Sequence, residues 1–183
     1  MFIAHLPAGY LATRLILDRE PEPTPFRRRL LALGMIASVL PDLDLLWFYF
    51  VDHRRQVHHA YLPHLPLAWI TLFAAAALGL WMRRAGRTAW LVMLVFAANI
   101  LLHLVLDTTA GGIRWLWPFS NTEFAMSHVE ARHQAWYLNF VLHWTFALEV
   151  AILAAALWTA WRRHVSRRGY GLGSTPQSPP EMP

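Results

Sequence analysis

The stretch LVMLVFAANILLHLVLD, residues 91–107, decides how this chain folds. It forms most of a predicted helix from about Ala89 to Leu106, which approaches the roughly 20 residues needed to cross about 30 Å of hydrocarbon. Asn99, His103 and Asp107 interrupt this apolar run at intervals of four, so they share one face of the helix. Ionisable groups at membrane depth are costly. The stripe must therefore face the inside of a helical bundle, either as a metal site or as a structural hydrogen bond of His103.

The rest of the 183-residue chain is equally apolar: 56% of its residues are hydrophobic and only 15% are charged. An ordinary soluble domain has about 25% charged residues. Three more segments are predicted to span a membrane, and a shorter fifth is half-inserted or packed against the others. These four further segments are about Leu30 to Phe50, Leu65 to Met82, Asn139 to Trp161, and Ile3 to Leu17. The predicted fold is all-α, a polytopic membrane bundle of four to five transmembrane helices.

Basic residues form short clusters at the ends of apolar segments, namely 27–29, 83–87 and 162–168. This pattern sets membrane topology, whereas nucleic-acid binding would need one continuous basic face. We therefore expect no nucleic-acid partner, a cytoplasmic C-terminus, and an N-terminus and polar site that face outward. Residues 1–164 are predicted to form a single integral membrane domain. Residues 165–183, rich in Gly, Ser and Pro, are predicted to be a disordered cytoplasmic tail.

Two aspartates, Asp42 and Asp44, follow Pro41 inside an apolar segment. On a regular helix, residues two apart point in nearly opposite directions. Pro41 removes a backbone donor and predicts a kink or an unwound turn here. Both carboxylates could then converge on one ion, or one could bind while its neighbour orients a histidine. The alternative is a helix cap plus a surface aspartate, which the apolar surroundings make less favourable.

Histidines 58, 59 and 64 occupy a linker that Pro63 keeps from being helical. Imidazole is a common ligand of zinc, and several histidines in one stretch favour ligation over a single packed core histidine. His59 and His64 are therefore predicted ligands, while the role of His58 stays open.

Three other residues stand alone in apolar segments. His5 lies near the outer end of its segment and is included among the predicted ligands, and the role of His143 stays open. Glu149 lies deeper, where a carboxylate is costly. It is a general base, a partner for an arginine, or a protonated group. Asp44 and Glu149 are the predicted catalytic residues, since either could accept a proton from water.

The complete predicted ligand set is His5, Asp42, Asp44, His59, His64, His103 and Asp107. The chain has no cysteine, so any metal must be held by nitrogen and oxygen. This mixture suits zinc, with manganese as the alternative. More than four good ligands suggests two adjacent ions, although a single ion is also compatible. The predicted cofactor is therefore one or two divalent metal ions.

The order of these motifs resembles the YdjM-like family of predicted membrane-bound metal-dependent hydrolases. The matching elements are His5, Leu40 to Asp44, His59 to His64, His103 to Asp107, and Trp117-Pro118. The family's middle element usually reads His-Arg-Gly-x-Thr-His, whereas this chain keeps only the spacing. The resemblance implies hydrolysis in a bacterial inner membrane. The family's similarity in ligand pattern to zinc-dependent phospholipase C points towards phosphoesters.

The leading hypothesis is therefore a membrane-embedded hydrolase that uses metal-activated water on a lipid-linked or membrane-proximal ester, most simply a phosphoester. The first alternative is a non-catalytic protein that binds or transports a divalent metal ion or protons. Transport would require polar groups through the cytoplasmic half of the bundle, where the sequence offers almost none. The second alternative is a scaffold in which the polar residues only hold the helices together.

Overall fold

The computed structural model describes residues 3–19, 24–56 and 58–171. Seven α-helices lie within these ranges: α1 (His5–Leu17), α2 (Thr24–Ala37), α3 (Asp44–Phe50), α4 (Pro66–Met82), α5 (Arg87–Thr108), α6 (Trp136–Val141) and α7 (Thr145–Gly171). Single turns of 3-10 helix cover Pro41–Leu43, His58–Ala60 and Leu62–His64. The predicted all-α fold is thus observed in the described part of the chain.

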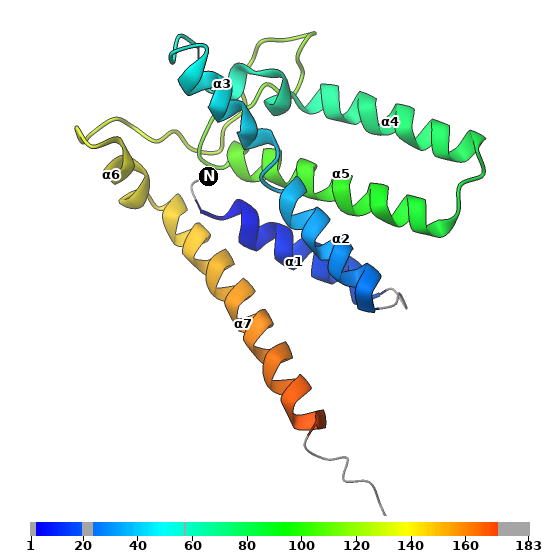
Figure 1. Ribbon diagram of the computed structural model, residues 1–183. Helices are drawn as coiled ribbons and strands as arrows, with labels where there is room; N and C mark the ends of the chain where they lie inside the picture. The colour runs from blue at the N-terminus through cyan, green and yellow to red at the C-terminus, as the bar shows by residue number, and fades with distance from the viewer. Residues whose placement is uncertain (1–2, 20–23, 57, 172–183) are drawn as a thin grey trace, which may run out of the picture.

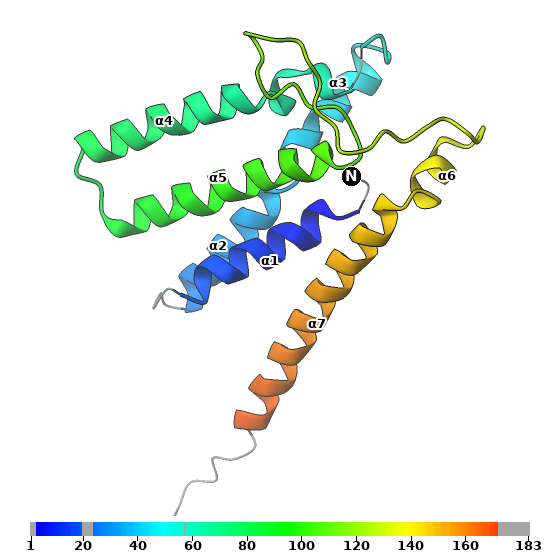
Figure 2. The same ribbon diagram turned by 180° about the vertical axis from the view of Figure 1, so that it is seen from behind.

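Helices α1, α2 and α5 pack against one another, α4 lies antiparallel beside α5, and α7 contacts α1 (Figures 1 and 2). One end of the three-helix core is apolar, where Leu17, Leu30, Leu91 and Val95 are buried together. The opposite end holds the start of α1, the end of α5, and the elbow between α2 and α3. The candidate site lies at this second end.

Asn99 joins the three core helices at mid-height. Its Nδ2 donates to Thr13 Oγ1 on α1 at 3.0 Å and to the Val95 carbonyl at 2.7 Å. Gly9 and Gly34 allow this close packing, because a Cβ on either would collide with side chains of the neighbouring helix. Asn99, the innermost residue of the predicted polar stripe, therefore links helices.

The predicted irregularity at Pro41 is present. Residues 25–37 and 41–50 form two helical pieces with a bend of 51° between them. Across the bend the backbone makes tighter bonds, from Asp42 N–H to Val39 O and from Leu43 N–H to Leu40 O. Because proline lacks an N–H, the α-helical bonding pattern cannot continue through this position. The elbow moves Asp42 and Asp44 out of regular helical register.

Fewer spans than predicted meet the requirements for crossing a membrane. In the described ranges, α5 and the Thr145–Ser166 part of α7 are long and apolar enough, and the bent α2–α3 pair would make a third. Helix α4 is apolar but has only 17 residues. Two or three spans are therefore supported by length and composition, and the count of four to five stays a prediction.

The last helical segment begins later and ends later than the sequence indicated. Instead of one helix over 139–161, α6 ends at Val141 and α7 starts at Thr145. His143 explains the break, because its Nδ1 accepts from the Thr145 N–H at 3.4 Å and so caps α7. Helix α7 then continues to Gly171, whereas disorder was expected from residue 165. Arginine is a good helix former and is favourable near a helix C-terminus. Residues 172–183 of the expected tail lie outside the described part.

Candidate metal centre

Four separate segments bring their polar side chains together at one end of the bundle. The start of α1 contributes His5, the elbow contributes Asp42 and Asp44, the linker before α4 contributes His58, His59 and His64, and the last turns of α5 contribute His103 and Asp107. Every predicted ligand is therefore in or beside this cluster, together with His58, whose role was left open.

Asp107 lies between four imidazoles. Its Oδ1 is 3.1 Å from His5 Nε2, and its Oδ2 is 3.0 Å from His103 Nε2. The same Oδ2 lies 3.5 Å from His64 Nε2 and 3.8 Å from His59 Nε2. In each case the nitrogen that faces the carboxylate is Nε2, the atom at the far end of the ring.

Asp42 occupies the opposite side of the cluster and faces the same kind of atom. Its Oδ1 is 3.4 Å from His58 Nε2 and 3.7 Å from the Nε2 atoms of both His64 and His103. Its Oδ2 is 4.0 Å from His5 Nε2. Two carboxylates and five Nε2 atoms therefore surround one small region.

The other ring nitrogens are held from behind. His64 Nδ1 is 2.7 Å from Asp44 Oδ2, His103 Nδ1 is 2.8 Å from the Ser38 carbonyl, and His59 Nδ1 is 3.2 Å from the Gly112 carbonyl. A metal-binding histidine usually donates its second N–H to a carboxylate or carbonyl, which fixes the ring and the tautomer. Three of the five rings have this support, and a fourth, His58, has its Nδ1 3.2 Å from Asp44 Oδ1.

The cluster is closed on the bundle side and partly open on the other. The side chains of His64 and His103 are fully buried, and that of Asp107 is 2% exposed. By contrast, Asp42 is 29% exposed, His58 22% and His59 20%. Solvent and any small substrate therefore reach the cluster on the side of the linker.

The linker histidines carry opposite pKa shifts. Burial lowers the pKa of His59 to about 4, against the attraction of Asp107. Burial also acts to lower the pKa of His64, but hydrogen bonds with Asp107, Asp42 and Asp44 prevail and raise it to about 10. The carboxylates thus favour the protonated form of His64, while burial favours a neutral His59 with a lone pair available for a ligand.

The donor atoms fit one or two metal ions. Asp42, His64, His103 and Asp107 each offer an atom within 4.8 Å of the others, and so do His58, His59 and His64. The two groups share His64, so they describe adjacent positions. Their nitrogen and oxygen donors suit zinc and similar divalent ions.

Two further features agree with a cation at this place. Nδ1 of His5 is buried without a hydrogen-bond partner in the described part of the chain, and the ring is stacked on His103 with centroids 3.9 Å apart. The His59 ring lies over Gly111, where a Cβ would come within 2.7 Å of Cε1. The glycine leaves room for an imidazole next to the end of α5.

The two predicted catalytic residues lie elsewhere in this arrangement. Asp44 sits behind His64, and its Oδ1 is 3.2 Å from His58 Nδ1, so it contacts the backs of two imidazole rings and belongs to neither group of converging atoms. Glu149 is buried on α7 and accepts from the backbone N–H groups of Ile3 and Ala4, at 3.2 Å from the latter. It fixes the segment that leads into His5.

The loop after α5 contacts the site through its first residues. Gly112 provides the carbonyl for His59, and Ile113 is fully buried in an isolated bridge to Phe124. Phe119, in contrast, is 87% exposed. Contact with the site thus comes from the start of the loop.

The chain is similar to known inner membrane proteins. The model of the family described as YdjM inner membrane protein matches residues 1–168. Inner membrane protein YbcI of Escherichia coli strain K12 is 35% identical over 102 residues, which cover 52% of this chain and 57% of that protein. The chain therefore matches little more than half the length of this relative. No solved structure matches.

Proposed function

Since the chain belongs to the YdjM inner membrane protein family, we propose that it works in the bacterial inner membrane as a metal-dependent hydrolase. The proposed substrate is a lipid-linked or membrane-proximal ester, in the first place a phosphoester. We also propose four to five membrane-spanning helices, with the site and the N-terminus facing outward and the C-terminus in the cytoplasm.

One observation carries this proposal: five histidine Nε2 atoms converge on Asp42 and Asp107 at a partly open edge of the bundle. Divalent ions held there would act as Lewis acids on the ester and lower the pKa of water. Zinc is the favoured ion, manganese the alternative, and the two overlapping ligand groups suggest two positions.

The chain's own residues divide into three tasks. His64, His103 and Asp107 form the buried floor, whose rigidity comes from Asp44 and the Ser38 carbonyl behind the rings. His58 and His59 line the open edge, where a substrate phosphate would enter. Asp42 lies near His103 of the buried floor and near His58 of the open edge, and it is the most exposed carboxylate of the cluster. It is placed to accept a proton from a water molecule at the edge.

The geometry favours an enzyme over a transporter. In the three core helices, as far as the structure describes them, the buried polar side chains inward of His103 are Asn99 and Thr13, and the next layer is the apolar group that contains Leu17 and Val95. An ion path to the other side would need polar groups through this layer. Metal-dependent flux in vesicles that contain the purified protein would instead favour the transport alternative.

The test combines metal content and turnover. We expect gently purified protein to contain zinc or manganese in stoichiometric amount and to cleave a phospholipid phosphoester, with both properties lost in His103→Ala. His53→Asn is the matched control, because His53 is exposed in a loop with a φ of 51° that asparagine tolerates. Metal-free wild-type protein, or unchanged metal and turnover in His103→Ala, would refute the proposal.

A further inference from the structure

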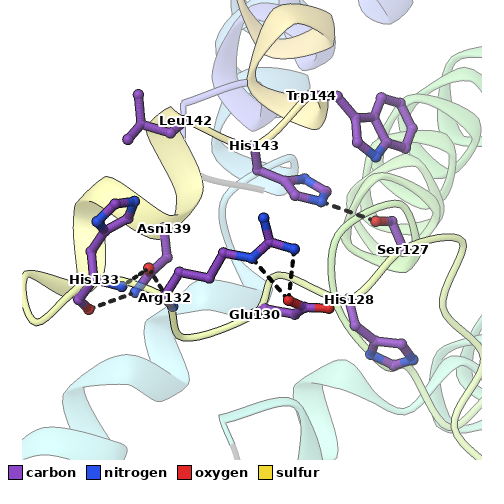
Figure 3. Close-up of a pocket in the computed structure, with 9 residues that line it drawn as sticks. All are labelled: Ser127, His128, Glu130, Arg132, His133, Asn139, Leu142, His143 and Trp144. Atoms are coloured by element: carbon purple, nitrogen blue, oxygen red, sulfur yellow. Dashed lines mark hydrogen bonds and ion pairs between the residues drawn. The ribbon is translucent and has the colours of Figure 1, made fainter.

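A second polar cavity, separate from the histidine cluster, lies where α6 meets α7. Its volume is about 450 Å³. Its lining comes from the loop before α6, from α6 itself and from the α6–α7 junction (Figure 3). The lining residues are Ser127, His128, Glu130, Arg132, His133, Asn139, Leu142, His143 and Trp144. None of these residues belongs to the predicted metal site.

Hydrogen bonds of one side chain, Asn139, hold the loop at the rim of the cavity. Asn139 Oδ1 accepts from the backbone N–H groups of Arg132 at 3.0 Å and His133 at 2.7 Å, while its Nδ2 donates to the His133 carbonyl at 3.1 Å. One side chain thus closes the loop through three hydrogen bonds, as Figure 3 shows. The rim keeps Arg132 beside the cavity.

The floor presents a hydroxyl donor. His143 Nδ1 lies 2.9 Å from Thr145 Oγ1 and accepts from the Thr145 N–H at 3.4 Å, which favours the ring tautomer with its hydrogen on Nε2. Nε2 then donates to Ser127 Oγ at 3.2 Å. The hydroxyl hydrogen of Ser127 is left to donate to a ligand oxygen in the cavity.

The wall carries both signs of charge. Arg132 donates to Glu130 at 2.9 Å through Nε and also through Nη2, in an ion pair whose side chains are 75% and 68% exposed. Such an exposed pair contributes little to stability, so a ligand can separate it at small cost. The guanidinium suits a phosphate, and the carboxylate suits an ammonium group.

The mouth of the cavity is apolar and lies at the end of a membrane-spanning helix. Leu142 and Trp144 line it and are 67% and 58% exposed, and α7 begins immediately afterwards at Thr145. Further along α7, Val150 is also exposed. Tryptophan prefers the interface between headgroups and acyl chains, so a lipid could place its headgroup in the cavity and its chains along α7.

We propose that this cavity binds the zwitterionic headgroup of a phospholipid, with the phosphate on Ser127 and Arg132 and the ammonium group on Glu130. The proposal is independent of hydrolysis at the metal centre, because it concerns other residues and requires no bound ion.

The test uses protein purified in detergent with EDTA, so that metal plays no part. Native mass spectrometry measures binding of phosphatidylethanolamine, phosphatidylglycerol and diacylglycerol with identical chains. We expect phosphatidylethanolamine to bind most tightly and Arg132→Ala to weaken it roughly tenfold. Glu130→Gln is expected to remove the preference over phosphatidylglycerol. Both residues are exposed, so the substitutions leave the fold intact.

Arg114→Ala is the matched control, since Arg114 pairs with Glu123 at 2.9 Å elsewhere in the same loop and does not line the cavity. Equal binding by the Arg132→Ala and Arg114→Ala variants would overturn the proposal. So would diacylglycerol adducts as abundant as those of phosphatidylethanolamine, since the phosphate would then be irrelevant. Displacement of the lipid by millimolar inorganic phosphate would identify a free-phosphate site instead.

Discussion

Replacing Asp44 by asparagine tests whether this carboxylate is a metal ligand or a hydrogen-bond partner that orients histidine rings. Asp44 Oδ2 is 2.7 Å from His64 Nδ1, and Oδ1 is 3.2 Å from His58 Nδ1. Asparagine keeps one acceptor oxygen but presents an NH₂ donor in place of the other. One of the two imidazoles therefore loses its acceptor and faces a donor instead, while the converging Nε2 atoms and both ligand carboxylates stay in place.

The loss of such a supporting carboxylate lowers metal affinity by about 10- to 100-fold. Because a factor of ten corresponds to about 1.4 kcal/mol, the expected change in binding free energy is about 1.4–2.7 kcal/mol. The assay is a competition titration of zinc against a chromophoric chelator, together with elemental analysis at saturating zinc. We expect weaker affinity with unchanged stoichiometry.

Asp52→Asn is the control, since Asp52 accepts a 2.7 Å hydrogen bond from Tyr61 outside the cluster. Two results would refute the reasoning. If Asp44→Asn removed bound zinc as completely as His103→Ala does, Asp44 would be a ligand. If it bound zinc as tightly as wild type, the carboxylate would have no effect on the rings.

Three other perturbations test the rest of the site. Gly111→Ala is expected to weaken zinc binding less than His59→Ala does, because the new methyl group displaces the His59 ring without removing it; equal affinity to wild type in the same titration would contradict the packing. Zinc binding at pH 7.5 is expected to release about one proton, because His64 has a pKa raised to about 10 and must lose its proton to coordinate. The apparent affinity should accordingly fall as pH is lowered from 10 to 6.5, and calorimetry in two buffers of different ionisation enthalpy measures the proton; a buffer-independent heat would count against it. Glu149→Gln is expected to retain turnover, since the amide oxygen can still accept from the N-terminal backbone, whereas Glu149→Leu should lower the free energy of unfolding by about 1–3 kcal/mol for each unsatisfied N–H. Loss of turnover in the Gln variant with normal thermal unfolding would instead mark Glu149 as a general base.

Hydropathy and spacing were sufficient to predict an all-α fold and the polar segments that meet. The His103–Asp107 stripe faces the interior because its burial in lipid would be costly. Pro41 bends its segment because proline cannot make the helical hydrogen bond. Both predictions depend on local chemistry that one segment contains in full, and both agree with the structure.

The remaining features depend on contacts between segments. Sequence could not decide between Asp42 and Asp44, because the direction of each carboxylate follows from the geometry of the elbow. His58 was left without a role since its ring reaches the cluster only through the turn after residue 57. One sequence signal for the position of His59 is the glycine pair at 111 and 112. Gly111 leaves space for the His59 ring, and Gly112 provides the carbonyl beside its Nδ1.

The break at His143 was missed for a similar reason. Its stretch of sequence is predominantly apolar, and hydropathy alone predicts an unbroken helix there. The imidazole competes with the helix by accepting the N–H of Thr145, and such side-chain capping by histidine has no periodic signature. The hydrogen bond from the Thr145 N–H to His143, which accompanies the break, also positions a side chain that lines the cavity at the start of α7.

The sharing of His64 between the two ligand groups has a consequence for how ions would be held. Its Nδ1 is engaged by Asp44, so only Nε2 can coordinate, and one lone pair serves one ion. The deeper position would then have a set of four donors, whereas the outer position would keep His58 and His59 and need solvent or substrate to complete it. A bound pair of ions would therefore be asymmetric, with one ion held firmly and the other exchangeable. A mild chelator should strip the outer ion first and leave the inner one in the protein.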